Sequence, residues 1–142
     1  MAEVLARLED VSRTYQKGKE KVEVLHNLDL QIPTGDFIAI MGPSGSGKTT
    51  LLNLLGGLDR PTSGTIHVGD AELTAMSNSQ LSQWRSTNIG FIFQFYNLLP
   101  VLTAQKNVEL PLLLTSFSGK ERAERAAIAL DIVGLADRAR HY

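Results

Sequence analysis

The chain has 142 residues, a formal net charge of −1, a hydrophobic share of 43% and no cysteine. Its length suits one ordinary domain with a core of its own, and its balanced charge excludes the basic footprint of a nucleic-acid-binding protein. The lack of cysteine excludes disulfides and cysteine metal sites, and no run approaches the ~20 apolar residues of a membrane-spanning helix.

The first third of the chain predicts an antiparallel β layer. Residues 4–11 mix apolar and charged side chains like a strand, and residues 22–25 and 28–32 alternate apolar and polar side chains. Such alternation is typical of half-buried strands. The polar residues 15–21 predict a turn. A second turn leads into the apolar run 37–41, which predicts a buried parallel strand.

The next eight residues carry a phosphate-binding motif. They fit the pattern G-x-x-x-x-G-K-[ST] and read Gly42-Pro43-Ser44-Gly45-Ser46-Gly47-Lys48-Thr49. Glycines let such a loop curl so that backbone N–H groups approach phosphate oxygens, and the helix predicted from Thr50 points its positive dipole end at the same place. Lys48 would place a positive charge on the β and γ phosphates, and Thr49 would offer a hydroxyl to Mg²⁺. The strand and helix patterns on either side favour this interpretation over a glycine-rich turn before an ordinary helix.

The middle of the chain predicts two strands separated by a short helix. Residues 65–68 predict the first strand, and residues 79–86 predict the helix, in which Trp84 is expected to pack against the core. Residues 88–93 predict the second, apolar strand, and Gln94 follows it directly.

The last forty or so residues predict two helices. Residues 103–114 read as a helix that Pro111 disturbs. Ser118 and Glu121 form a capping-box pattern at the start of the next helix, and Gly134 stands where a C′ residue belongs. The apolar face of that helix is expected to hold Ala123, Ala126, Ala127, Leu130 and Val133.

Taken together, these features resemble the ATP-binding subunit of an ABC transporter over essentially the whole chain. Tyr15, before the turn at Gly18, resembles the aromatic residue that stacks on adenine in this family. Residues 58–64 look like the segment after the family's first helix, and residues 89–94 look like the strand that ends in its glutamine loop. The resemblance implies an α/β P-loop NTPase core with a mainly parallel sheet, an N-terminal antiparallel β layer and the start of a helical subdomain.

Within this family, the amino-acid sequence is most similar to the lipoprotein-releasing and macrolide-export branch. Residues 95–100, 102–104 and 107–111 carry this similarity. Lys106 departs from it, because the branch usually has an acidic residue before the Asn-Val pair.

The resemblance implies that ATP and Mg²⁺ bind to this chain. The nucleotide-binding residues would be Tyr15 and residues 42–50. Lys48 and Gln94 would be catalytic, and Thr49 and Gln94 would hold Mg²⁺, with Gln94 also reaching the attacking water. From position alone, Tyr15 could instead pack in a turn, and Gln94 could be a polar strand end.

The resemblance also implies protein partners. Residues 95–100 would form part of the surface that receives a helix of a transmembrane permease subunit, although they could instead pack inside the chain. The complete protein would form a homodimer through the nucleotide site. It would lie in the cytoplasm, peripheral to the inner face of the cell membrane.

Only the N-terminal part of the family's domain is expected here. Residues 1–94 would form the β layer and P-loop core, and residues 95–142 would start the helical subdomain. The LSGGQ signature, the Walker B aspartate, the general-base glutamate and the switch histidine of the family would follow Tyr142. Residues 1–142 alone are therefore expected to be inactive in hydrolysis and to expose an apolar sheet edge.

Three functional hypotheses follow. The first is an ATP-binding subunit of an ABC export system that couples ATP hydrolysis to a permease. The second is an ABC-type ATPase that acts as a switch or recruiter without transport, as in the cell-division relatives. The third is a nucleotide-binding fragment without turnover.

Overall fold

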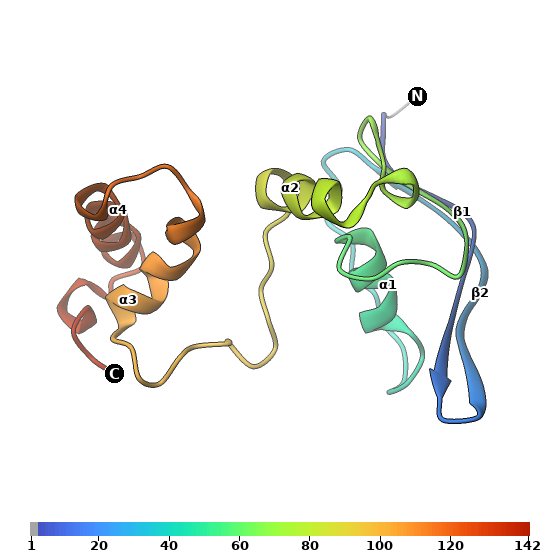
Figure 1. The fold of residues 1–142 in the computed structure, drawn as a ribbon, viewed down its shortest axis with the longest axis horizontal. Coiled ribbons are helices and arrows are strands. Elements are labelled where there is room, and N and C mark those ends of the chain that lie inside the picture. The colour runs from blue at the N-terminus through green and yellow to red at the C-terminus, as the bar shows by residue number, and fades with distance from the viewer. Residues whose placement is uncertain (1–2) are drawn as a thin grey trace. The chain divides into compact units, whose positions relative to one another are not determined.

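The computed structural model describes residues 3–142, except for the side chain of Lys17. The chain divides into two compact units at the bond between Gly90 and Phe91 (Figure 1). Each unit is described by itself.

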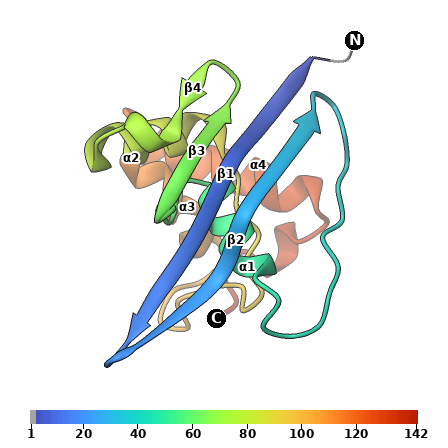
Figure 2. The same cartoon turned by 90° about the vertical axis from the view of Figure 1, so that its right-hand side faces the viewer.

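The first unit is built on a four-stranded antiparallel sheet with the order β2-β1-β3-β4. Its strands are β1 (Val4–Lys17), β2 (Glu20–Pro33), β3 (Ser63–Val68) and β4 (Ala71–Glu72). Figure 2 shows the long strand β1 between β2 and β3. The predicted strand at 4–11 and the half-buried strands at 22–25 and 28–32 are confirmed, and the strands extend further than predicted, so that little of the expected turn at 15–21 remains.

Alternation along β1 explains which face of the sheet is covered. Ala6 and Leu8 are buried, whereas Leu5, Arg7 and Glu9 are exposed. The buried face packs against the helices α1 (Lys48–Leu55) and α2 (Asn78–Asn88) and the 3₁₀ turn η1 (Leu73–Ala75). The resulting core contains Leu8, Val11, Leu51, Leu54, Ile66, Leu73 and Leu81, with Trp84 packed against it as predicted. Each fully buried leucine contributes about 1.5–3 kcal/mol through the hydrophobic effect.

Two predicted strands are absent from the described residues. The prediction was wrong for residues 37–41 and 88–93, since neither segment belongs to a strand. Both are apolar, and Phe37 (99%), Met41 (88%) and Ile92 (103%) are almost fully exposed. A strand needs a neighbour for its N–H and C=O groups. No strand of the described residues pairs with either segment.

The second unit is helical. It contains α3 (Ala104–Glu109), the 3₁₀ helix η2 (Leu110–Leu114), α4 (Gly119–Ile132) and the 3₁₀ turn η3 (Ala136–Arg138). The helix predicted at 103–114 is therefore α-helical only to Glu109. The change to a 3₁₀ helix coincides with Pro111, which lacks an N–H for the α-helical ladder.

Both ends of α4 follow local sequence rules. The predicted capping box is confirmed: the Glu121 N–H donates to the Ser118 hydroxyl, and the Ser118 N–H donates to the Glu121 carboxylate. At the other end Gly134 has a φ of 71°. The Leu135 N–H donates to the Leu130 carbonyl over 2.8 Å, which completes a Schellman motif.

The predicted apolar face of α4 is only partly buried. Ala126 and Leu130 are buried and Ala123 is half-buried, whereas Ala127 and Val133 are exposed. Helix α3 packs against this face.

Lys106, the position singled out in the sequence analysis as different from the similar branch, forms an ion pair within α3. Its amine lies 2.6 Å from Oε2 of Glu109, whose side chain is only 10% exposed. The other carboxylate oxygen of Glu109 is buried and has no hydrogen-bond partner among the described residues. A buried carboxylate with a single partner depends strongly on that partner.

Replacing Lys106 by glutamate is expected to destabilise the second unit by about 1–3 kcal/mol. The substitution removes the cation and adds a second carboxylate one helical turn from Glu109. Urea unfolding of the complete protein, with hydrogen exchange of α3, measures the loss. Lys120→Glu makes the same charge change at an exposed position of α4 and serves as the control. Equal stabilities of the two variants would rule out the role of the ion pair.

Candidate functional site

The phosphate-binding motif forms an open loop that ends at the first residue of α1. Gly47 is the N-cap of α1, with φ 87° and ψ 1°. A Cβ on Gly47 would lie 3.1 Å from the carbonyl oxygen of Val24 and 2.9 Å from Cδ2 of Leu25. Glycine at this position therefore lets the loop sit directly on β2 and supplies the left-handed backbone that the turn into α1 needs.

The side chain of Lys48 folds back into the loop. Its amine lies 2.9 Å from the carbonyl oxygen of Gly42, 2.6 Å from that of Pro43 and 3.3 Å from Oγ of Ser46. The loop thus surrounds a positive charge, which is the arrangement that attracts phosphate oxygens.

The first turn of α1 adds donors to this charge. Among the described residues, none accepts a hydrogen bond from the backbone N–H groups of Lys48, Thr49 or Thr50, and Gly47 offers no side-chain cap. The unpaired N–H groups and the helix dipole together favour an anion at this end.

A cavity of about 560 Å³ lies beside the loop. Its volume falls in the range of small-molecule sites, about 300–1,000 Å³. It is lined by Val24, Ser44, Gly45, Gly47, Lys48, Thr49 and Thr50. The structure therefore brings most of the predicted phosphate-binding residues together around one space.

Tyr15 is held by two residues that the sequence analysis missed. Its hydroxyl donates to Oδ2 of Asp59 over 2.6 Å, and the guanidinium of Arg13 lies 4.4 Å from the centre of its ring. Arg13 also bonds both oxygens of Asp59, over 3.0 Å and 2.7 Å. In the structure Arg13 and Tyr15 both lie on β1, which extends beyond the predicted strand at 4–11, so the sequence analysis had no signal that paired them.

The carboxyl of Asp59 is held in its charged form. Burial raises the pKa of Asp59. The hydrogen bonds from Tyr15 and from the Arg60 backbone, together with the charge of Arg13, lower this pKa by more than burial raises it. The pKa of Asp59 therefore lies below its ordinary value. Asp59 therefore stays an acceptor at neutral pH.

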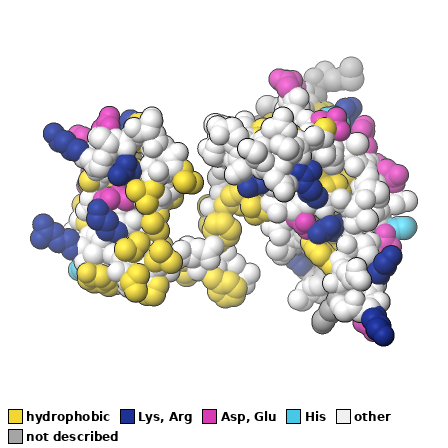
Figure 3. All heavy atoms as spheres, viewed as in Figure 1, with side chains coloured by type: hydrophobic (Ala, Val, Ile, Leu, Met, Phe, Trp, Pro, Cys, Tyr) yellow, Lys and Arg dark blue, Asp and Glu magenta, His cyan; other side chains and the backbone are white. Residues whose placement is uncertain are grey.

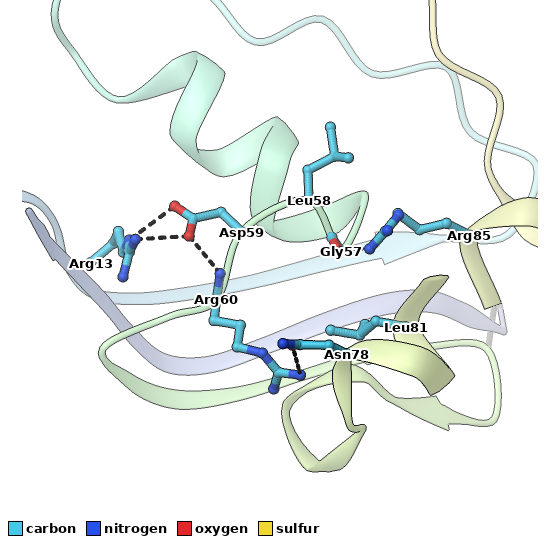
Figure 4. Close-up of a pocket in the computed structure, with 8 residues that line it drawn as sticks. All are labelled: Arg13, Gly57, Leu58, Asp59, Arg60, Asn78, Leu81 and Arg85. Atoms are coloured by element: carbon cyan, nitrogen blue, oxygen red, sulfur yellow. Dashed lines mark hydrogen bonds and ion pairs between the residues drawn. The ribbon is translucent and has the colours of Figure 1, made fainter. Parts of the chain in front are cut away.

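Asp59 also borders a second cavity, of about 380 Å³, which Figure 4 shows with its eight lining residues. Arg13 points toward Asp59, and the guanidinium of Arg60 points toward Asn78 (Figure 4). Arg85 donates to the carbonyl oxygen of Gly57 over 2.6 Å. The guanidinium groups of Arg13, Arg60 and Arg85 thus each have an acceptor within the protein. Such internal pairing is typical of arginines that stabilise the fold.

Gln94 belongs to the second unit, where it is exposed in a turn. Thr49 belongs to the first unit, so a joint role of these two residues in holding Mg²⁺ stays a prediction.

The predicted partner-binding segment 95–100 is exposed along its whole length. Phe95, Tyr96 and Leu98 are exposed by 80%, 82% and 65%, and Figure 3 shows hydrophobic side chains at the surface of the second unit. The amide of Asn107 fixes the end of the segment by bonding both the N–H and the carbonyl oxygen of Leu99. An exposed apolar patch on an ordered segment is typical of an interaction site.

Comparison with known proteins identifies the family. A family model described as ABC transporter matches residues 25–142. The chain belongs to this family. Among the described residues, no helix is long and apolar enough to span a membrane.

The relatives include members of the branch that the sequence resembles. The ABC transporter ATP-binding protein YknY of Bacillus subtilis is 49% identical over 137 residues, which are 96% of this chain and 60% of the relative. The lipoprotein-releasing system ATP-binding protein LolD of Legionella pneumophila is 45% identical, over 99% of this chain and 62% of the relative. The macrolide export ATP-binding/permease protein MacB of Brucella abortus is 45% identical, over 96% of this chain and 21% of the relative.

A solved structure of an ABC cassette matches the fold. The dimeric post-hydrolysis state of the ATP-binding cassette MJ0796 of Methanocaldococcus jannaschii, bound to ADP and Pi, has a TM-score of 0.84 and 42% identity. The match covers 96% of this chain and 60% of that chain. The predicted α/β P-loop fold class with an antiparallel β layer is confirmed. The mainly parallel sheet is not formed, since every strand pair among the described residues is antiparallel. The chain spans about 60% of the length of YknY, LolD and MJ0796.

Proposed function

We propose that the complete protein is the ATP-binding subunit of an ABC-type export system. One observation carries this proposal. In a member of the ABC transporter family, a glycine-rich loop holds the amine of Lys48 beside the unpaired N–H groups of α1. The names of LolD and MacB, an ATP-binding protein of lipoprotein release and a macrolide exporter, favour export over the switch or recruiter alternative.

The site fits the phosphates of a nucleotide. The backbone N–H groups of Lys48, Thr49 and Thr50 and the amine of Lys48 are donors around one cavity, and these donors match the oxygens of the β and γ phosphates. The hydroxyl of Thr49 and the amide oxygen of Gln94 are hard oxygen donors, which suit Mg²⁺. Bound there, Mg²⁺ would neutralise charge on the β and γ phosphates.

The chain's own residues would then assist hydrolysis by position and charge. Lys48 would stabilise the charge that develops on the γ-phosphate as water attacks in line. Gln94 would orient that water, and the ring of Tyr15 would stack on the adenine. We propose, from the resemblance, that the general base would follow Tyr142, so turnover is expected from the complete protein and not from residues 1–142 alone.

We further propose two protein partners. The exposed apolar segment 95–100 would receive a helix of a transmembrane permease subunit, which would hold the protein at the inner face of the cell membrane. A second copy would close over the nucleotide in a head-to-tail homodimer. The solved structure of the MJ0796 cassette is dimeric, which supports this second proposal.

Replacing Gln94 by alanine tests the hydrolytic role. We expect ATP hydrolysis by the complete protein to fall by at least about tenfold, because the water loses its orienting group. The dissociation constant for ATP should change by less than about threefold, since Lys48 and the loop remain to bind the phosphates. Steady-state phosphate release and equilibrium ATP binding measure the two effects.

Gln83→Ala is the matched control, because Gln83 is an exposed glutamine of α2. An unchanged hydrolysis rate in Gln94→Ala would contradict the role of Gln94. The absence of ATP binding in the unmodified protein would contradict the proposed function itself.

A further inference from the structure

We propose that Asp59 and Arg13 are positioning residues that hold the ring of Tyr15 as a one-sided platform for the base of the nucleotide. This inference rests on the proposed function and adds to it two residues that position the ring of Tyr15.

Asp59 and Arg13 fix different features of the Tyr15 ring. The hydroxyl lies on the long axis of the ring, so its 2.6 Å bond to Asp59 sets where the tip of the ring lies. That bond leaves the ring free to rotate about its axis. The guanidinium of Arg13, 4.4 Å from the ring centre, restricts this rotation because it stacks on one face.

Arg13 is itself held by Asp59. Its Nε and Nη2 atoms bond Oδ2 and Oδ1 of the carboxylate, over 3.0 Å and 2.7 Å. A bidentate pair of this kind fixes the plane of the guanidinium, which a single lysine amine could not do. The backbone N–H of Arg60 donates to Oδ1 over 2.8 Å and fixes the carboxylate in turn.

Tyr15 needs such support because of its place on the sheet. Strand β1 pairs with β3 only as far as Ser12, so beyond that point β1 and β2 form a two-stranded ribbon. Two-stranded ribbons twist more freely than wider sheets and are marginally stable alone. The Thr14 N–H donates to the Thr62 hydroxyl over 2.9 Å and holds the backbone beside Tyr15, but without further contacts the position of the ring itself would still vary.

Asp59 ties the ribbon to the helix of the phosphate-binding loop. The backbone N–H groups of Leu58 and Asp59 donate to the carbonyl oxygen of Asn53 near the end of α1, over 2.8 Å and 3.2 Å. Helix α1 starts at Lys48. The same short helix therefore positions the phosphate-binding amine at one end and, through Asp59, the Tyr15 ring at the other.

Arg13 also decides which face of the ring is available. One face carries the guanidinium, while Tyr15 as a whole stays half-buried and thus partly accessible. A base can stack only on the other face. The part of the affinity that depends on the base should accordingly require Asp59, whereas the part that depends on the phosphates should not.

The experiment compares two ligands on the complete protein. ATP offers both base and phosphates, whereas inorganic tripolyphosphate offers the phosphates alone. In Asp59→Asn, which keeps the shape of the side chain and removes its charge, we expect ATP to bind about tenfold more weakly, from lost stacking. Tripolyphosphate should bind within about twofold of the unmodified protein.

Two further variants provide a second test and a control. Arg13→Lys keeps the charge and loses the two-pronged pairing, so it should also weaken ATP and spare tripolyphosphate, even if Asp59→Asn does not fold. Asp70→Asn removes the charge of an exposed aspartate in the β3–β4 turn and should change neither ligand.

The outcomes separate this inference from the proposed function. Equal weakening of both ligands in Asp59→Asn and in Arg13→Lys would assign both residues a purely structural role and overturn the inference. Unchanged ATP binding in both variants would overturn it too. If the unmodified protein bound neither ATP nor tripolyphosphate, the proposed function would fail first.

Discussion

Alanine in place of Lys48 is expected to weaken ATP binding by the complete protein by about 10- to 100-fold, the value of one or two charge-assisted hydrogen bonds. The amine of Lys48 is the positive charge that the loop surrounds, with three loop oxygens within 3.3 Å. Its loss leaves only backbone N–H groups to meet the charge of the phosphates. Equilibrium binding of ATP, followed by calorimetry or a fluorescent analogue, measures the change.

Lys21→Ala is the control for the loss of one positive charge, because Lys21 is exposed on the β1–β2 hairpin. ATP affinity in this control should equal that of the unmodified protein. If Lys48→Ala also kept the original affinity, the loop could not be the nucleotide site and the proposed function would be lost.

The second large effect concerns stability. We expect Gly64→Ala to destabilise the protein by more than about 3 kcal/mol, because strain and a steric clash add together. Gly64 has a φ of 86°, and an added Cβ would lie 2.5 Å from the carbonyl oxygen of Glu9 and closer still to that of Asp10. Both oxygens belong to β1, so relief would require the strands to separate at the centre of the sheet.

Gly69→Ala separates these two causes. Gly69 follows β3 with a φ of 56°, but an added Cβ there would meet nothing within 4 Å. Only the backbone strain remains, about 1–2 kcal/mol. Urea unfolding of both variants measures the difference, and equal midpoints would show that the close approach to β1 carries no cost.

Features that depend on a few neighbouring residues could be predicted from the sequence. The capping box of Ser118 and Glu121, the C′ position of Gly134 and the loop that ends at Gly47 all follow from local backbone rules. The strands on residues 22–25 and 28–32 followed from alternation, which a sheet with one covered face imposes.

Features that depend on residues far apart in the sequence could not be predicted from the sequence. The apolar runs 37–41 and 88–93 have the composition of buried strands, but a strand forms only against a neighbour. The bonds from Arg13 and Tyr15 to Asp59 bridge separations of 46 and 44 residues. No local pattern specifies such a pair, although the ABC-like segment 58–64 could have drawn attention to Asp59.

The bonds of Lys48 to its own loop have a consequence for nucleotide exchange. The amine has partners at Gly42, Pro43 and Ser46 of its own loop, and these bonds help to keep the loop in shape. On binding, phosphate oxygens would replace neutral carbonyl oxygens as partners of the Lys48 amine. This exchange of partners is favourable only when the oxygens of the ligand carry more negative charge than the loop oxygens that they replace. We therefore expect the loop to discriminate against neutral ligands in favour of anionic ones.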